Sequence, residues 1–123
     1  MRLRWLINAS MALLVAPPAG ADPRPLGSDE IRTLLTGNTV HGTWAGREYF
    51  SYFEAGGWTT YVAVGGSRTD GRWSVHDGKY CSVWAGANES CYELQMDGST
   101  LEWVTSAGQH YPSQVLPGNQ LPK

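Results

Sequence analysis

The stretch from Gly71 to Leu94 constrains the fold most, because it holds both cysteines of the chain and its clearest strand alternation. Apolar and polar residues alternate on either side of Asp77-Gly78, a dipeptide typical of two-residue β-hairpin turns. This turn predicts three facing pairs: His76–Lys79, Val75–Tyr80 and Trp73–Ser82. The stretch therefore indicates an antiparallel sheet.

Two further turns extend the register along the chain. Ala85-Gly86-Ala87 is expected to form a three-residue loop, and Asp97-Gly98 another two-residue turn. Together they predict these facing pairs: Trp84–Asn88, Cys81–Cys91, Tyr80–Tyr92, Leu94–Leu101 and Tyr92–Trp103. Because a slip of one residue would exchange the two faces of a strand, the separation of apolar from polar residues supports these registers.

The four registered strands place most of their apolar side chains on one face. That face holds Trp73, Val75, Tyr80, Trp84, Tyr92, Leu94, Met96, Leu101 and Trp103. The opposite, mostly polar face holds Arg72, Ser74, His76, Lys79, Cys81, Val83, Cys91, Glu93, Gln95 and Glu102. An apolar face of this size has to be covered, and closing the sheet into a barrel covers it without a second domain.

Cys81 and Cys91 face each other on neighbouring strands in this register, where Cα atoms ~4.5 to 5.5 Å apart can be bridged. We therefore predict a disulfide between them, worth roughly 2 to 3 kcal/mol for a loop of about ten residues. The pair lacks the Cys-x-x-Cys spacing of redox motifs, which favours a structural role.

Residues 1–21 have the pattern of a secretory signal peptide. Arg2 and Arg4 precede an apolar run, and Ala19-Gly20-Ala21 provides a small-residue cleavage site before Asp22. A membrane anchor is the alternative, but the run stops at Pro17-Pro18, short of the ~20 apolar residues that a span requires. We predict a periplasmic or secreted protein, with no stable membrane span in the mature chain and an environment in which disulfides form.

The remaining residues predict a single domain. Residues 22–27 read as an extended lead-in, 28–36 as a short helix with Ser28 as its N-cap, and 117–123 as a surface tail. From Asn38 onward, glycine-rich turns separate short strand candidates, at 39–44, 48–54, 58–64 and 109–115. The domain at 28–116 is thus expected to be mainly β: a small antiparallel up-and-down β-barrel or curved meander of seven or eight strands, with the helix plugging or capping one end.

Charge and motifs argue against several functional classes. Without residues 1–21 the chain keeps seven of nine Lys and Arg and all eleven Asp and Glu, so its net charge is 7 − 11 = −4. With no basic run, we expect no nucleic-acid partner. His41, His76 and His110 lack metal-ligand spacing, and no nucleophile elbow or phosphate-binding loop is found. We predict no catalytic residue, no metal and no cofactor.

The aromatic content of the chain favours a binding function. Tyrosine and tryptophan combine an apolar body with a polar group, which suits a ligand pocket or a protein interface, although they would also fill a small barrel core. The candidate contacts to a small apolar ligand or an envelope protein are Trp44, Tyr52, Trp58, Tyr61, Trp84 and Trp103.

A set of short motifs resembles a family of small exported bacterial proteins of unknown function. These motifs are Leu34-Leu35-Thr36-Gly37-Asn38-Thr39, Tyr52-Phe53 with Gly57, Gly71-x-Trp73, Asp77-Gly78, Cys81-x-x-Trp84, Cys91-Tyr92, Asp97-Gly98 and Leu116-Pro117-Gly118-Asn119. The resemblance covers the mature chain and implies a periplasmic or secreted location, but it supplies no catalytic residues.

Two shorter segments resemble other families. Gly42-Thr43-Trp44 is similar to the Gly-x-Trp near the first strand of lipocalins and avidins, whose barrels hold small ligands. Thr105-Ser106-Ala107-Gly108, followed by Tyr111, resembles a segment of periplasmic lysozyme inhibitors. We expect a non-catalytic binding module; the alternatives are an inhibitor of an envelope-degrading enzyme and a small metal-dependent or hydrolytic enzyme.

Overall fold

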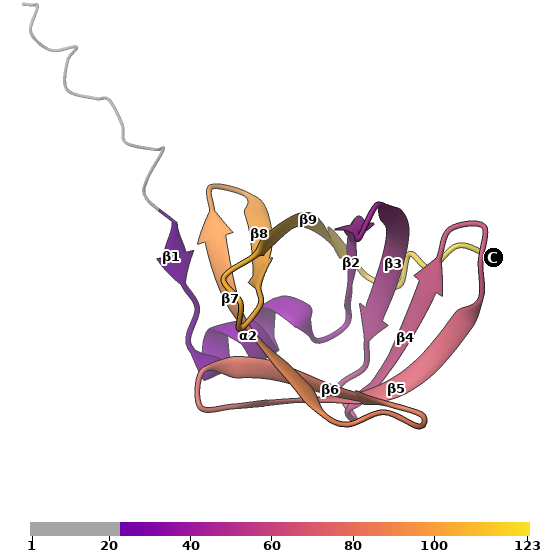
Figure 1. Cartoon of the computed structure of the whole chain (residues 1–123), viewed down its shortest axis with the longest axis horizontal. Helices are drawn as coiled ribbons and strands as arrows, with labels where there is room; N and C mark the ends of the chain where they lie inside the picture. The colour runs from indigo at the N-terminus through magenta and orange to yellow at the C-terminus, as the bar shows by residue number, and fades with distance from the viewer. Residues whose placement is uncertain (1–22) are drawn as a thin grey trace, which may run out of the picture.

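A computed structural model describes residues 23–123 of the chain, so the predicted signal peptide lies outside the described residues. Strands β2 to β9 form a closed, antiparallel eight-stranded β-barrel, and the short β1 adds to β7 (Figure 1). The elements are β1 Arg24–Pro25, α2 Ser28–Leu35, β2 Asn38–Trp44, β3 Arg47–Phe53, β4 Trp58–Ala63, β5 Arg68–His76, β6 Lys79–Trp84, β7 Ser90–Asp97, β8 Thr100–Val104 and β9 His110–Pro117. The predicted fold class is confirmed.

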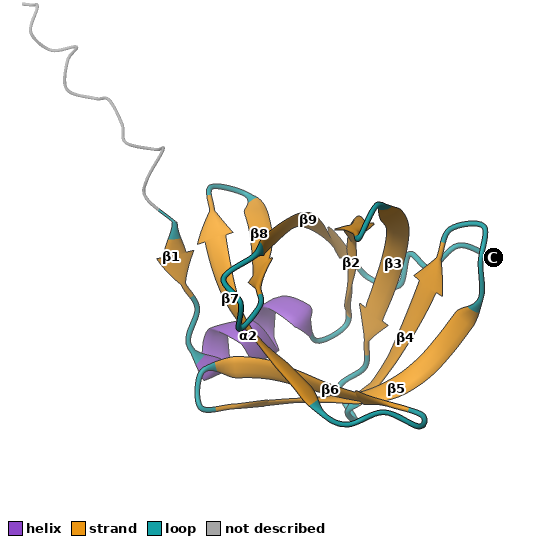
Figure 2. Cartoon of the chain, in the orientation of Figure 1, coloured by secondary structure: helices purple, strands orange, loops and turns teal. Residues whose placement is uncertain are grey.

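The barrel is an up-and-down meander, because each strand from β2 to β9 pairs with the next one along the chain. It closes where β9 returns to β2, from the pair Asn38–Pro117 to the pair Gly42–Ser113. Figure 2 shows that the one helix and the loops and turns between the strands make up the rest of the described chain. Closure leaves no free edge between β2 and β9.

The register predicted around Asp77-Gly78 is confirmed. All three predicted pairs across the β5–β6 hairpin are present, and Asp77 and Gly78 both have positive φ, as a type I′ turn requires. Cys81 pairs with Cys91 as predicted. The predicted pair of Trp84 with Asn88 is wrong, because pairing between β6 and β7 ends at Ser82 and Ser90, which leaves a longer loop.

The turn predicted at Asp97-Gly98 is displaced by one residue. Asp97 still pairs with Thr100, so the turn residues are Gly98 and Ser99, and Gly98 takes the positive φ of 65° at the first turn position. The observed pairs are therefore Met96–Leu101 and Leu94–Trp103. Moving the turn by one residue shifts the register by two, so each side chain keeps its predicted face.

Helix α2 packs against β2, β5 and β6 at one end of the barrel, and Ile31 and Leu35 on its inner face are fully buried in the core. The predicted N-cap is wrong by one residue: Gly27 has the extended N-cap conformation. The Ser28 hydroxyl instead accepts a hydrogen bond of 2.8 Å from the Gly78 amide, joining the helix to the β5–β6 turn. No helix among residues 23–123 is long and apolar enough to cross a membrane.

The C-terminal segment crosses the start of β2. Strand β9 continues to Pro117, two residues past its predicted end. Thr39 then donates its hydroxyl to the Gly118 carbonyl at 2.6 Å and accepts from the Gln120 amide at 2.8 Å. The Asn38 side chain accepts from the Gly118 amide at 3.1 Å. These bonds fix the end of the chain to the strand that follows the helix.

Candidate ligand-binding cavity

The inward-facing side chains leave a cavity of about 360 Å³ inside the barrel. Eight of its eleven lining residues are aromatic and the other three carry a hydroxyl; none is charged. The lining residues are Trp44, Tyr49, Ser51, Phe53, Tyr61, Thr69, Tyr80, Ser82, Trp84, Tyr92 and Trp103. A concave, mostly apolar site with a few polar groups is the usual form of a small-molecule site.

The cavity has a buried floor and an accessible mouth. Phe53, Tyr80 and Trp103 form the floor and are at most 5% exposed. Trp44 ends β2 and Trp84 ends β6, and both are partly exposed. Helix α2 packs near the opposite ends of these strands, so the cavity opens away from the helix.

Aromatic pairs hold the mouth in shape. Trp44 stacks on Tyr111 with ring centroids 4.1 Å apart, and its indole meets Tyr92 edge-on at 5.5 Å. Tyr61 meets Trp84 edge-on at 6.0 Å. Such stacked and edge-on contacts are the preferred geometries of aromatic rings. The mouth is therefore lined by rings that already support one another.

Gly71 on β5 creates the space for the Trp84 indole. The two residues face each other across β5 and β6. A Cβ atom on Gly71 would lie 2.5 Å from Trp84 Cε3 and 2.8 Å from the Val83 carbonyl oxygen, so any larger residue would displace the ring or the backbone. Glycine at this position sets the shape of one cavity wall.

Hydroxyl groups supply the polarity of the cavity. Ser51 Oγ lies 3.5 Å from Thr59 Oγ1, and Thr59 donates its own proton to the Tyr52 carbonyl at 2.9 Å. Ser51 therefore keeps acceptor capacity. Burial raises the pKa of Tyr80, while a hydrogen bond from Ser82 opposes this shift. Burial also raises the pKa of Tyr49, so both phenols remain neutral at ordinary pH.

Four of the six candidate contacts predicted from sequence line this cavity: Trp44, Tyr61, Trp84 and Trp103. The other two do not. Tyr52 alternates with the inward-facing Ser51 and Phe53 on β3, so its side chain lies on the outer face. Trp58 is 48% exposed and packs on the Arg72 guanidinium, whose Cζ lies 4.6 Å from the ring centroid.

The sequence interpretation missed the contribution of β3 to the cavity. Tyr49, Ser51 and Phe53 all face inward, alternating with outward residues along the strand. The alternation can be seen in the sequence. However, no turn residue indicated which of the two alternating sets of side chains faces the core. In the structure, β2 supplies the answer, because Gly42 pairs with Tyr49 and leaves room for its ring.

The three histidines lie outside the cavity and pair with different glutamates. His41 Nε2 is 2.6 Å from Glu48, His76 Nε2 is 3.7 Å from Glu89, and His110 Nδ1 is 2.8 Å from Glu102. These pairs are exposed to different degrees on the outer surface of the strands or their turns. The histidines are thus distributed over three places rather than assembled into one site.

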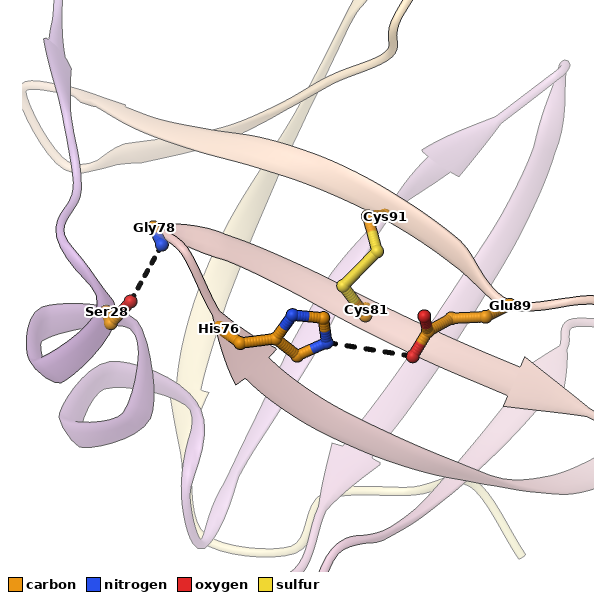
Figure 3. Close-up of a disulfide and its surroundings, with 6 residues drawn as sticks. All are labelled: Ser28, His76, Gly78, Cys81, Glu89 and Cys91. Carbon is orange, nitrogen blue, oxygen red and sulfur yellow. Dashed lines mark hydrogen bonds and ion pairs between the residues drawn. A yellow bond between two sulfur atoms is a disulfide. The ribbon is translucent and has the colours of Figure 1, made fainter.

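His76 and Glu89 lie beside the disulfide (Figure 3). The predicted bond between Cys81 and Cys91 is present, with Cα atoms 4.0 Å apart. The four side chains form the one group of three or more metal-ligand residues found among residues 23–123. Because both sulfur atoms are used in the disulfide, only the imidazole and the carboxylate are left as strong ligands, too few for a structural zinc site.

Comparison with known proteins gives no match: no family model fits the chain, and no curated protein or solved structure is similar to it. The geometry of the cavity and the residues that line it are therefore the observations that bear on function.

Proposed function

We propose that this protein is a non-catalytic binding module that holds a small apolar ligand in its barrel. The observation that carries the proposal is the aromatic cavity of about 360 Å³, open at the end opposite α2. A barrel interior that served packing alone would be filled by its side chains, as interiors are close-packed. Here the rings of Trp44 and Trp84 instead stand at the edge of an accessible space.

The chemistry of the lining supports binding rather than catalysis. Its polar groups are hydroxyls, and none has a neighbouring base among the lining residues that would activate it as a nucleophile. The histidines, which are common catalytic bases, lie outside the cavity, each beside its own glutamate. A protein with these features would retain its ligand unchanged.

The disulfide supports an extracytoplasmic location. Disulfides form and persist in oxidising compartments, and the Cys81–Cys91 bond fits such a compartment. Together with the signal-peptide pattern of residues 1–21, it favours a periplasmic or secreted protein. A carrier or sensor of a sparingly soluble compound would be useful in that location.

The proposal is tested with the neutral apolar fluorophore N-phenyl-1-naphthylamine, titrated into the purified, disulfide-bonded mature protein. Saturable enhancement of its fluorescence is expected, together with quenching of tryptophan emission. Trp84→Ala should weaken binding by about fivefold or more, because it removes one ring of the mouth. Trp58→Ala is the matched control, since that indole lies on the outer surface. Absence of saturable binding, or equal losses in both variants, would contradict the proposal.

A further inference from the structure

The few polar side chains that line the cavity indicate which class of ligand it can bind. Ser51 lies between Tyr49 and Phe53 on β3, and Ser82 lies between Tyr80 and Trp84 on β6. Both serines are at most 5% exposed and both line the cavity. Thr69, the third lining residue with an aliphatic hydroxyl, is partly exposed, so Ser51 and Ser82 supply the buried aliphatic hydroxyls of the wall.

No charge among the lining residues accompanies these hydroxyls. Burial also raises the pKa of Tyr49 and Tyr80, so their phenols remain neutral hydrogen-bonding groups and do not supply phenolates. A carboxylate brought into this space would lose its hydration without gaining a cationic partner, which is unfavourable. A neutral hydroxyl, amide or carbonyl would instead find donors and acceptors of its own kind.

Arg47 follows the turn after Trp44, which lies at the mouth of the cavity. Its Nη1 atom lies 3.0 Å from the position that a Cβ on Gly66 would occupy. The guanidinium therefore extends over the β4–β5 turn rather than into the cavity, and the residue is exposed to solvent. Its charge opposes the rise in pKa that burial gives Tyr61, but none of the residues that line the cavity is itself cationic.

We infer that the cavity selects an uncharged, flat aromatic compound bearing one hydrogen-bonding group, which Ser51 and Ser82 receive inside the barrel. The flat shape follows from a wall made largely of rings, and the hydrogen-bonding group from the two buried serine hydroxyls in that wall. This inference rests on the proposed function and specifies the class of its ligand. It assigns a polar anchor to two residues that sequence patterns did not indicate.

Three probes of the same ring size test the inference at pH 7.5: 2-naphthol, which is neutral, naphthalene, which lacks the hydroxyl, and 2-naphthoate, which is anionic. Dissociation constants are measured by quenching of tryptophan fluorescence. We expect 2-naphthol to bind about tenfold or more tightly than 2-naphthoate, and about two- to tenfold more tightly than naphthalene, as expected for one net hydrogen bond. Equal or tighter binding of 2-naphthoate would overturn the inference.

Variants test whether Ser51 and Ser82 bind the polar group of the ligand. The double variant Ser51→Ala/Ser82→Ala should bind naphthalene as well as the unmodified protein does, and should lose the preference for 2-naphthol. Ser74→Ala, on the exposed outer face of β5, should keep that preference. A preference that survives in the double variant would refute the role of the two serines. Should the double variant fold poorly by circular dichroism, the ranking of the three probes on the unmodified protein still decides the charge preference.

The outcomes separate this inference from the function on which it rests. If N-phenyl-1-naphthylamine binds with the Trp84 dependence stated above but 2-naphthoate equals 2-naphthol, the binding function holds and the neutral-ligand inference fails. A further variant, Arg47→Gln, then shows whether the anion reaches the mouth arginine. If no probe binds, both the function and the inference fail.

Discussion

Individual residues matter in this barrel chiefly where a small side chain makes room for a large one. Gly71 accommodates the indole of Trp84, and Gly42 accommodates the ring of Tyr49, whose hydroxyl would lie 3.2 Å from an added Cβ. In both pairs the glycine faces its aromatic partner across neighbouring strands. At these two positions, a glycine on the adjacent strand leaves the space that an aromatic side chain occupies.

Gly71→Ala is expected to destabilise the protein by about 1 to 3 kcal/mol, because the new methyl group would overlap the Trp84 ring and the Val83 carbonyl. Urea unfolding followed by circular dichroism measures the change. Gly56→Ala is the control: no atom lies within 4 Å of its added Cβ and its φ is not positive, so it should change the free energy of unfolding by less. Equal effects of the two substitutions would contradict this account.

At the level of elements, β6 and β7 share the shortest pairing of the barrel hairpins described here. They are joined by three register pairs, from Tyr80–Tyr92 to Ser82–Ser90, whereas β5 and β6 are joined by six. The disulfide lies in the middle of those three pairs. A covalent bond thus reinforces the place where the backbone ladder contributes least.

The double variant Cys81→Ala/Cys91→Ala should lower the free energy of unfolding by roughly 2 to 3 kcal/mol, since it releases the loop of ten residues that the bond closes. Chemical unfolding compares the variant with the oxidised protein, and the reduced unmodified protein should resemble the variant. A loss below about 1 kcal/mol would mean that the unfolded chain gains little freedom when the bond is absent.

The hairpins also show which parts of the fold could be predicted from the sequence. Asp77-Gly78 fixed the β5–β6 register because both residues take positive φ, which few other dipeptides tolerate. Asp97-Gly98 has a similar composition, yet there glycine opens the turn and aspartate ends the strand. Sequence alone does not distinguish these two uses of Asp-Gly. The faces of β7 and β8 were nevertheless predicted correctly, because the shift of two residues preserves the alternation.

The candidate site was predictable in part for the same reason. The registered strands placed Trp84 and Trp103 on the interior, where they line the cavity. Tyr52 and Trp58 lay on strands without a registered turn, and both point outward. The cavity itself could not be predicted from the sequence. Whether the rings fill the interior or leave a space depends on how β9 pairs with β2 when the barrel closes, and no local sequence pattern encodes that pairing.

For the whole molecule, the buried phenols predict a loss of stability at alkaline pH. Burial raises the pKa of Tyr49 and Tyr80 in the folded state, so above about pH 10 the unfolded chain releases protons that the folded protein retains. Their contribution to stability is therefore present below pH 10 and declines as the pH rises beyond it.

Tyr80→Phe should make this decline shallower by up to about 1.4 kcal/mol per pH unit, the amount expected for one proton. Urea unfolding at pH 7.5 and at several values between pH 10 and 11.5 measures the slopes. The comparison at pH 7.5 is the internal control, because neither protein loses a phenolic proton there. Identical alkaline slopes for the variant and the unmodified protein would show that Tyr80 ionises equally in both states.

The pairing of β9 with β2 also has a consequence for the timing of folding. Asn38 meets Pro117 across this pair, so strands separated by most of the domain must come together before the barrel exists. The chain up to the end of β9 would have to leave the ribosome before the barrel could close. Contacts of such long sequence separation form slowly. The barrel would thus close only after β9 has been synthesised.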